Sequence, residues 1–472
     1  MAQTDLLPFL PTSAAHQQSF SDNTPALYDQ ATGWMTYGEL RDKINDVSSC
    51  LEENERSLVL CSLPNSVESV IAYLALASMG HSLLMTVPDA HDFDVLIQCY
   101  RPNLIVTPQS LENSGLKKCA TPLSTLNFYQ RLGESTDLHP DLFLLLLTSG
   151  STSVNKAVRL SYSNIAHNTK AIIESLGLDN AGRALAHLPL AYSFGLSVLH
   201  THLATGGSCV LTEDSLLSQN FWHSVREQDI THFYGVPYHF EMMDRLGLKR
   251  LKVPSLKHFM QAGGKMALPL AQRIKGAVEK IPHNALYIMY GQTEAAPRLS
   301  CFNALAHADK LESCGIALSG QHFEIIDDEI IACGPNIMMG YAQDFSDLAK
   351  GDACHGRHAT GDFGKLDEQG FLFITGRKQR FAKLYGQRLA LDDIERCAAS
   401  LAPCLAVEGE GKIIIFAESA YRAQIGQIKN LILSQTSLQG PWVEVRTIDA
   451  FPYKANGKID YMALTQIGSK LP

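Results

Sequence analysis

The stretch Leu144–Leu160 reads LLLLTSGSTSVNKAVRL, and it is the most informative part of this sequence. Consecutive leucines predict a buried strand, which runs into a hydroxyl-rich segment followed by Lys156. Backbone N–H groups, hydroxyls and one ammonium gathered after a buried strand form a cradle for an anion. A Ser/Thr-rich surface loop has the same composition, and the Walker A spacing cannot be fitted here. The stretch alone leaves both interpretations open.

Strand-like and helix-like segments alternate on both sides of this stretch. Upstream, Ser57–Ser62 predicts a strand, and Ser66–Leu76 places apolar residues at helical spacing. Further short strands are predicted over Leu83–Val87, Leu104–Val106, Cys209–Leu211, His232–Tyr234 and Ala285–Met289. Strands that alternate with helices are typical of layered α/β proteins with a largely parallel sheet. We therefore expect an α/β fold with a large, multi-layer N-terminal body.

The pattern changes near residue 320, where the apolar segments become shorter. Phe323–Ile326 and Ile330–Cys333 flank a polar turn and predict a β-hairpin. Towards the C-terminus, Lys412–Ala417 and Trp442–Ile448 are strand-like and enclose a helical segment. We therefore expect a small α+β C-terminal domain, joined to the large body near residues 376–380.

Composition and charge exclude several classes of protein. The chain has 472 residues, and 39 Lys+Arg against 48 Asp+Glu give a formal net charge of −9. That sign argues against nucleic-acid binding and against a polybasic membrane surface. No apolar run approaches the roughly 18 residues of a membrane span, and the N-terminus lacks the features of a signal peptide. Since 46% of the residues are hydrophobic and 18% charged, we expect a globular, cytoplasmic protein without a membrane span.

The cysteines and histidines show no recognisable disulfide or metal pattern. There are 11 cysteines and no CxxC, so reduced thiols in a cytosolic chain are the simplest account. The pairs His200/His202 and His355/His358 have neither HExxH spacing nor a cysteine partner. We expect no metal ion at either pair.

Residues 148–156 resemble TSGSTGxPK, the phosphate-binding motif of the adenylate-forming, or AMP-binding, superfamily. Acyl-CoA synthetases, acyl-AMP ligases, nonribosomal adenylation domains and firefly luciferase belong to this superfamily. Six further segments resemble its other motifs in the same order: Ala262–Gly264, Tyr290–Glu294 (YGxTE), Gly334–Tyr341 (GPxxxxGY), Thr360–Asp362 (TGD), Gly376–Arg388 (GRxxxxxKxxGxR) and Pro452–Lys458 (PxxxxGK). The resemblance covers nearly the whole chain. It implies an AMP-binding adenylation domain at residues 1–376 and a small, mobile domain at residues 380–472.

The resemblance implies an enzyme that joins a carboxylic acid to AMP and releases pyrophosphate. Catalysis of such a transfer is mostly positioning and stabilisation of dense negative charge. The resemblance assigns Lys458 to the acid and ATP, Thr293 to the α-phosphate and Glu294 to Mg²⁺, which prefers oxygen ligands. Asp362 would accept hydrogen bonds from the ribose hydroxyls. The implied ATP-binding residues are Thr148, Ser149, Gly150, Ser151, Thr152, Lys156, Gly263, Gly264, Tyr290, Gly291, Gln292, Asp362 and Arg377.

The motifs depart from the family pattern at four positions. Ser153 stands where Gly is usual, and Asn155 stands where Pro is usual, which makes the loop less rigid. Gln379 replaces Asp at the implied hinge, and Tyr461 stands where many relatives have Arg. We expect these changes to be compatible with adenylation, and the hinge change to bear more on the second half-reaction than on the first.

The stretch Leu188–His200, LPLAYSFGLSVLH, bears on the identity of the acid. Amino-acid-activating relatives have an Asp after the Phe, and it pairs with the α-ammonium, whereas here Gly195 follows Phe194. Because a buried ammonium without a counter-charge is costly, we expect a small carboxylic acid of the fatty or aryl type. Phe194, Gly195, Phe233 and Tyr234 are the candidate pocket residues, although the aromatic side chains are equally compatible with an ordinary core.

The resemblance also implies a thiol acceptor, which is CoA or the phosphopantetheine of a carrier protein. The chain has no carrier segment of its own, so a carrier protein would be a separate chain. Two alternatives stay open: a stand-alone amino-acid-activating carrier-protein ligase, and a nucleotide-binding pseudo-enzyme. A pseudo-enzyme would be expected to lose Lys458 or Glu294, and both are present. Without GxSxG or GxGxxG, the sequence does not fit an α/β-hydrolase or a dinucleotide dehydrogenase.

Overall fold

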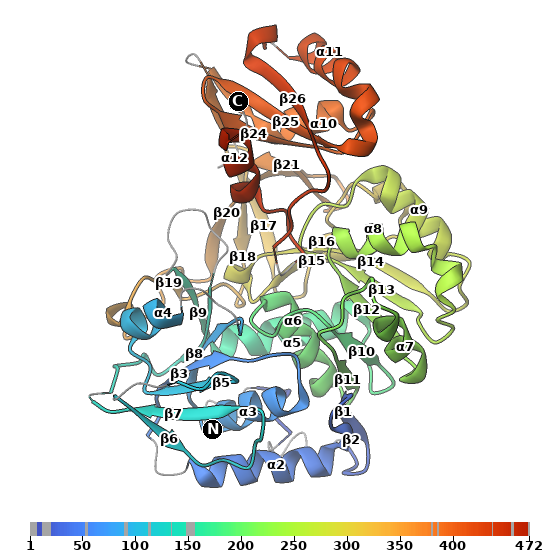
Figure 1. Ribbon diagram of the computed structural model, residues 1–472. Helices are drawn as coiled ribbons and strands as arrows, with labels where there is room; N and C mark the ends of the chain where they lie inside the picture. The colour runs from blue at the N-terminus through green and yellow to red at the C-terminus, as the bar shows by residue number, and fades with distance from the viewer. Residues whose placement is uncertain are drawn as a thin grey trace. The chain divides into compact units, whose positions relative to one another are not determined.

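The structure is a computed structural model, and it contains two compact units. It describes residues 7–11, 20–51, 55–88, 93–111, 115–133, 135–147, 156–378, 381–384, 387–436, 438–454 and 457–470. The first unit comprises Met1–Phe323 and Ala332–His358, and the second comprises Glu324–Ile331 and Ala359–Pro472. Figure 1 labels their helices and strands. Among the described residues, no helix is both long enough and apolar enough to cross a membrane.

An eight-stranded sheet of the first unit contains the leucine-rich stretch (Figure 1). Its strands, in spatial order, are β19 (Gly340–Ala342), β9 (Ala157–Ser161), β8 (Leu142–Leu147), β4 (Ser82–Thr86), β3 (Leu58–Ser62), β5 (Leu104–Thr107), β7 (Asn127–Arg131) and β6 (Leu116–Cys119). The four strands from β8 to β5 are parallel, and the outer strands pair antiparallel. The leucines therefore form a buried strand, as predicted, because a parallel strand covered on both faces is apolar throughout.

A nine-stranded sheet forms the other half of the first unit. Its strands, in spatial order, are β16 (Ile316–Ala317), β15 (Arg298–Asn303), β14 (Ala285–Gly291), β13 (His258–Gln261), β12 (His232–Gly235), β10 (Arg183–Ala186), β11 (Ser208–Leu211), β1 (Pro25–Asp29) and β2 (Gly33–Thr36). The strands from β14 to β1 are parallel. Those outside them are antiparallel. The predicted strands are confirmed, while the parallel arrangement holds only for the inner ones.

Helices cover these sheets and separate them. Those of the first unit are α2 (Tyr37–Cys50), α3 (Val67–Ser78), α4 (Phe93–Tyr100), α5 (Tyr162–Leu176), α6 (Ser193–Ala204), α7 (Gln219–Glu227), α8 (Pro237–Leu246) and α9 (Leu268–Val278). α3 and α5 each contact strands of both sheets, so they lie between them in the apolar core. Local sequence sets the helix ends: Thr36 and Glu39 form a capping box on α2, and α5 ends at Gly177 with a φ of 61°.

The second unit contains both strands and helices, and small sheets with helices are present in its C-terminal part. A four-stranded sheet, of which most residues belong to this unit, has the order β17 (His322–Ile326), β18 (Glu329–Cys333), β20 (Arg357–Leu366) and β21 (Leu372–Arg377). Further on are the pair β22 (Phe381–Leu384) and β23 (Gln387–Ala390), and a sheet of β24 (Cys404–Gly409), β25 (Lys412–Glu418) and β26 (Val443–Ile448). The helices are α10 (Leu391–Ala398), α11 (Ile425–Gln435) and α12 (Tyr461–Lys470). Ile428 and Ile432 of α11 are buried in the core of this unit. The domain boundary expected near residues 376–380 stays a prediction.

Candidate active site

The YGQTE segment follows the strand β14, and its backbone path depends on a glycine. β14 ends at Gly291, and Thr293–Ala295 form a single turn of 3-10 helix. A Cβ atom on Gly291 would collide with the carbonyl oxygen of Pro297, so only glycine allows this close approach. Thr293 Oγ1 lies 3.2 Å from Oγ of Ser193, the first residue of α6. The strand end and the helix start therefore meet at Thr293.

Glu294, Tyr341 and Lys156 bring three sequence motifs together. The Tyr341 hydroxyl donates a hydrogen bond to Glu294 Oε1 at 2.9 Å, and Lys156 Nζ lies 3.4 Å from the centroid of the Tyr341 ring. Burial raises the pKa of Tyr341, and the Glu294 carboxylate raises it further, so the phenol remains a donor. An ammonium over an aromatic face is a favourable pair. The three sequence segments that contain Lys156, Glu294 and Tyr341 thus meet at one place, where a cation and a carboxylate contact the same tyrosine.

Part of the predicted phosphate site lies outside the described residues. These positions are Thr148, Ser149, Gly150, Ser151, Thr152, Ser153 and Asn155. Gln379, at the implied hinge, also lies outside them. The roles of these residues stay predictions.

Two of the segments that the resemblance assigns to ATP binding lie at one edge of the nine-stranded sheet. Gly263 and Gly264 follow β13, and Tyr290 lies near the end of β14, its parallel neighbour. Gly263 has a φ of 83°, and a Cβ there would lie 2.8 Å from Tyr192 Oη. Gln292 Nε2 donates a hydrogen bond to Tyr290 Oη at 3.2 Å. The carboxyl edge of parallel strands is where α/β proteins commonly bind nucleotides, and the roles of these residues in ATP binding stay predictions.

Asp362, Arg377 and Lys458 belong to the second unit. Asp362 and Arg377 face each other across β20 and β21, with Arg377 Nε 3.0 Å from Asp362 Oδ1. The Asp362 side chain is 3% exposed and that of Arg377 is 61% exposed, so the guanidinium holds a buried carboxylate in place. Lys458 is half-buried, and its carbonyl accepts a hydrogen bond from Lys454 N at 2.8 Å.

Two of the three predicted pocket aromatics lie together. Phe194 of α6 and Tyr234 of β12 meet edge to face, with ring centroids 6.1 Å apart. Successive residues of a strand point to opposite faces of the sheet, and Phe233 is stacked on His187 with centroids 5.2 Å apart. The structure therefore brings Phe194 and Tyr234 together and leaves Phe233 in a separate cluster.

Gly195, the fourth predicted pocket residue, leaves no room for a side chain. A Cβ atom there would lie 2.5 Å from the carbonyl oxygen of Pro189 and 2.7 Å from that of Leu188. Backbone atoms cannot move aside as the end of a flexible side chain can. The position at which amino-acid-activating relatives carry an aspartate is therefore closed by the backbone.

One charged residue of this region was missed by the sequence analysis. Arg298 is the first residue of β15, is 3% exposed, and lies with its guanidinium carbon 4.6 Å from the centroid of the Phe194 ring. Burial lowers the pKa of Arg298 to about 10, which leaves it a cation at neutral pH. A signal was available in the sequence, since a lone arginine begins the apolar run RLSCF directly after the YGQTE segment.

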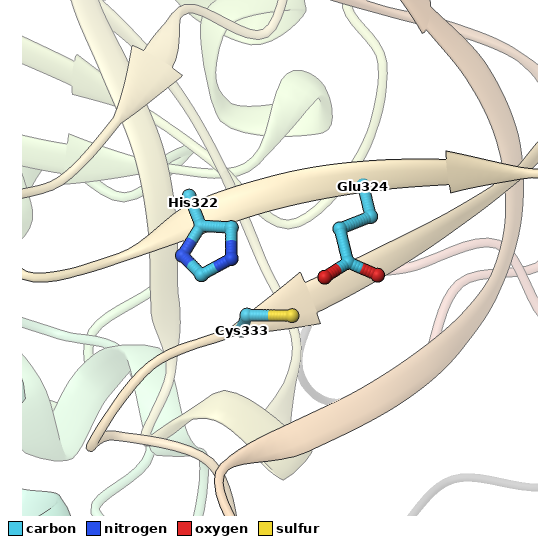
Figure 2. A group of neighbouring side chains, drawn as sticks. All are labelled: His322, Glu324 and Cys333. Atoms are coloured by element: carbon cyan, nitrogen blue, oxygen red, sulfur yellow. The ribbon is translucent and has the colours of Figure 1, made fainter.

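Figure 2 shows a second group that the sequence analysis did not find, on the hairpin of β17 and β18. Donor atoms of His322, Glu324 and Cys333 lie within 4.8 Å of one another. These donor types occur in zinc sites, but structural zinc sites use four donors. Each of the three residues also interacts with a partner in the chain. We assign this group no part in the chemistry proposed below.

Comparison with known sequences shows one family. A family model described as AMP-binding enzyme matches residues 14–342. A D-alanine–D-alanyl carrier protein ligase from Streptococcus pneumoniae is 25% identical over 406 residues, which cover 76% of each chain. A PKS-NRPS hybrid synthetase from Aspergillus candidus is 23% identical over 517 aligned positions, which cover 97% of this chain and 20% of that protein.

Solved structures show the same fold. ATP-bound MatB from Rhodopseudomonas palustris has a TM-score of 0.78 at 18% identity, and the match covers 100% of this chain and 99% of that one. The o-succinylbenzoate CoA synthetase MenE from Bacillus subtilis, in complex with an acyl-adenylate intermediate, has a TM-score of 0.71 at 19% identity. That match covers 94% of this chain and 96% of MenE. The mixed α/β fold is therefore that of the adenylate-forming enzymes.

Proposed function

The chain belongs to the family of AMP-binding enzymes, and on that premise we propose that it links a fatty or aryl acid to a thiol through an acyl-adenylate. The acid carboxylate attacks the α-phosphorus of ATP and pyrophosphate leaves. The thiol sulfur then attacks the acyl carbonyl, loses its proton and displaces AMP. The observation that carries this proposal is the contact of Lys156, Tyr341 and Glu294, which gathers a cation and a carboxylate from three motifs.

The residues fit the needs of the first step. Two anions must approach each other, so catalysis depends on positioning and on charge stabilisation. Lys156 and Lys458 would offset the charge of the phosphates and of the acid, and the Thr293 hydroxyl would donate to the α-phosphate. Glu294 would hold Mg²⁺, which neutralises phosphate charge when it is bound. Asp362, held by Arg377, would accept the ribose hydroxyls.

The acceptor thiol is proposed to be CoA or the phosphopantetheine of a separate carrier protein. Both kinds occur among the similar proteins, which include a CoA synthetase and D-alanyl carrier protein ligases. No contact of the described residues separates the two, so the experiment has to include both.

D-Alanine activation is the second candidate, because the curated relatives include D-alanyl carrier protein ligases at 25% identity. Two features weigh against it. The backbone closes the position of the aspartate that would pair with an ammonium. Arg298 is a buried cation at the predicted pocket and would repel that ammonium.

A pyrophosphate-release screen tests the proposal. The purified chain is incubated with Mg-ATP and a panel of fatty, aryl and amino acids, each with no acceptor, with CoA or with a phosphopantetheinylated carrier protein. We expect the enzyme to release pyrophosphate and AMP. For Glu294→Gln, which loses the carboxylate charge, pyrophosphate release should be more than ~10²-fold slower. Release of ADP and phosphate, or a D- or L-amino acid as the best substrate, would contradict the proposal.

A further inference from the structure

Arg298 is held rigidly by its backbone beside the predicted acyl pocket. Its N–H donates to Asn168 Oδ1 at 3.1 Å, and its carbonyl accepts from Asn168 Nδ2 at 2.7 Å. Asn168 belongs to α5 and is itself fully buried. The side chain therefore starts from a backbone position that buried hydrogen bonds fix.

The guanidinium of Arg298 lacks a suitable partner within the protein. Among the described residues, its side chain donates a hydrogen bond only to the Met289 sulfur, at 3.1 Å from a terminal nitrogen, and a thioether accepts hydrogen bonds weakly. Its Nε is buried and makes no hydrogen bond to any residue that the structure describes. Among the described residues, no carboxylate forms an ion pair with it. Burying a charge in this way is costly unless something pairs with it.

The titratable groups around Arg298 do not supply the missing anion. These are Tyr192, Tyr234 and Cys301, and burial raises the pKa of each, to about 12 for Tyr192 and about 11 for Cys301. All three are therefore neutral when Arg298 is charged. Within the part of the chain that the structure describes, no anion meets this positive charge, so it can pair with an anion that binds.

A second buried polar group in the same place also lacks a partner. Tyr234 is 2% exposed, and its buried hydroxyl makes no hydrogen bond within the described part of the chain. The nearby guanidinium partly offsets the effect of burial on the pKa of Tyr234, and Phe194 packs against both side chains. The cationic guanidinium of Arg298 and the neutral hydroxyl of Tyr234 thus both lie near the Phe194 ring, and both lack a good hydrogen-bond acceptor among the described residues.

A carboxylate completes this arrangement better than any other common group. It has two acceptor oxygens in a plane, which match the flat fork of a guanidinium and leave capacity for a hydroxyl donor. An ammonium would add a second positive charge, and an alkyl chain would leave both donors unsatisfied.

We propose that Arg298 and Tyr234 bind a second carboxylate of the acid, distinct from the carboxylate that is adenylated. The inference rests on the proposed function, because it places this group in the acyl pocket of an adenylating enzyme. The substrate class is then a dicarboxylic acid whose aliphatic or aryl body contacts Phe194.

The test compares acids that differ only in a distal carboxylate, namely hexanoate with adipate and benzoate with terephthalate. For the wild-type enzyme, kcat/KM for pyrophosphate release should be at least ~10²-fold higher for the better dicarboxylate than for its partner, because a site built to pair a buried polar group rejects the analogue without it. Arg298→Met should abolish that ratio, mainly through the KM of the dicarboxylate. Arg298→Lys should restore part of it, and Tyr234→Phe should lower it while keeping the ring.

Arg159 provides the matched control. It is another buried arginine of the first unit, but it donates to backbone carbonyls. Arg159→Met should leave the ratio between paired acids unchanged, whatever its effect on stability.

Several results would overturn the inference and leave the proposed function intact. One is wild-type preference for hexanoate and benzoate. Another is that Arg298→Met lowers kcat/KM equally for the monocarboxylate and the dicarboxylate of a pair, which would place Arg298 at the reacting carboxylate. A third is a raised KM for ATP, which would place it at the nucleotide. If no acid yields pyrophosphate, the proposed function fails, and a thermal shift caused by the dicarboxylates in wild type but not in Arg298→Met still decides the inference.

Discussion

Arg159 and Arg298 lie on strands of the same unit, with 2% and 3% exposure. Among the described residues, neither Nε makes a hydrogen bond, so the two side chains differ in the partners of their terminal nitrogens. Arg159 donates to the carbonyl oxygens of Lys350, Met339 and Gly351, the last two at 3.0 and 3.1 Å. Arg298 has a sulfur atom and an aromatic ring. A buried arginine whose acceptors are in the chain holds the fold together, whereas one whose acceptors are missing is suited to bind a ligand.

Buried histidines extend this comparison, because they avoid the cost of burial by losing their charge. Burial lowers the pKa of His200 to about 3 and those of His81, His202 and His239 to about 4. A base with a lowered folded-state pKa stabilises the fold fully above its unfolded pKa of about 6.5, and this stability is lost as the pH falls.

The largest effect we expect is therefore on stability in mild acid. Each such histidine should contribute about 2 kcal/mol less to the free energy of unfolding at pH 5 than at pH 7.5. Urea unfolding at the two pH values measures the change. Arg298 stays charged over this pH range and does not contribute to the change. A free energy of unfolding that is the same at both pH values would show that these histidines are protonated or solvated in the fold.

Replacing Lys458 by Ala separates catalysis from recognition of the acid. The lysine is proposed to act while the adenylate forms, so pyrophosphate release should fall ~10²–10³-fold for every acid, as for loss of one transition-state donor. The ratio between paired acids should not change, in contrast to the expected behaviour of Arg298 variants. Rapid-quench measurement of both half-reactions checks this. Thiol transfer from a chemically supplied acyl-adenylate should be much less affected, and equal damage to both steps would give Lys458 a structural or shared role.

Arg159→Met should destabilise the protein without changing which acid it prefers. The variant leaves buried carbonyl oxygens without a donor, and a few such losses sum to about 3 kcal/mol. A lower urea midpoint with an unchanged ratio between paired acids is the expected result. A changed ratio would remove the distinction between the two arginines.

Sequence reasoning could predict what depends on local pattern or on ordered motifs. The strand at Leu142–Leu147 and the β17–β18 hairpin follow from apolar runs and a polar turn. The separation of Phe233 from Tyr234 was also within reach, since neighbouring residues of a strand face opposite ways. The difference between the two arginines was not. Each stands in an apolar strand, and the acceptors of Arg159 lie more than 170 positions further along the chain.

The smallest expected effect is that of Arg298→Met on stability: the free energy of unfolding should stay unchanged or rise by about 1 kcal/mol. The direction of this change distinguishes a structural role of Arg298 from a binding role. The variant loses the contact of a cation with the Phe194 ring, which is worth about 2 kcal/mol when desolvated. It also removes a buried cation whose desolvation costs several kcal/mol and, among the described residues, is not offset by an ion pair. The second term is the larger, and a methionine side chain fills the apolar space beside Met289. Urea unfolding of the ligand-free protein measures the net change in the free energy of unfolding.

A decrease of more than about 2 kcal/mol in this free energy would mean that Arg298 supports the fold as Arg159 does. A gain, joined to a lost preference for dicarboxylates, would mean that the protein gives up stability to keep a charge ready for its substrate, as binding sites commonly do.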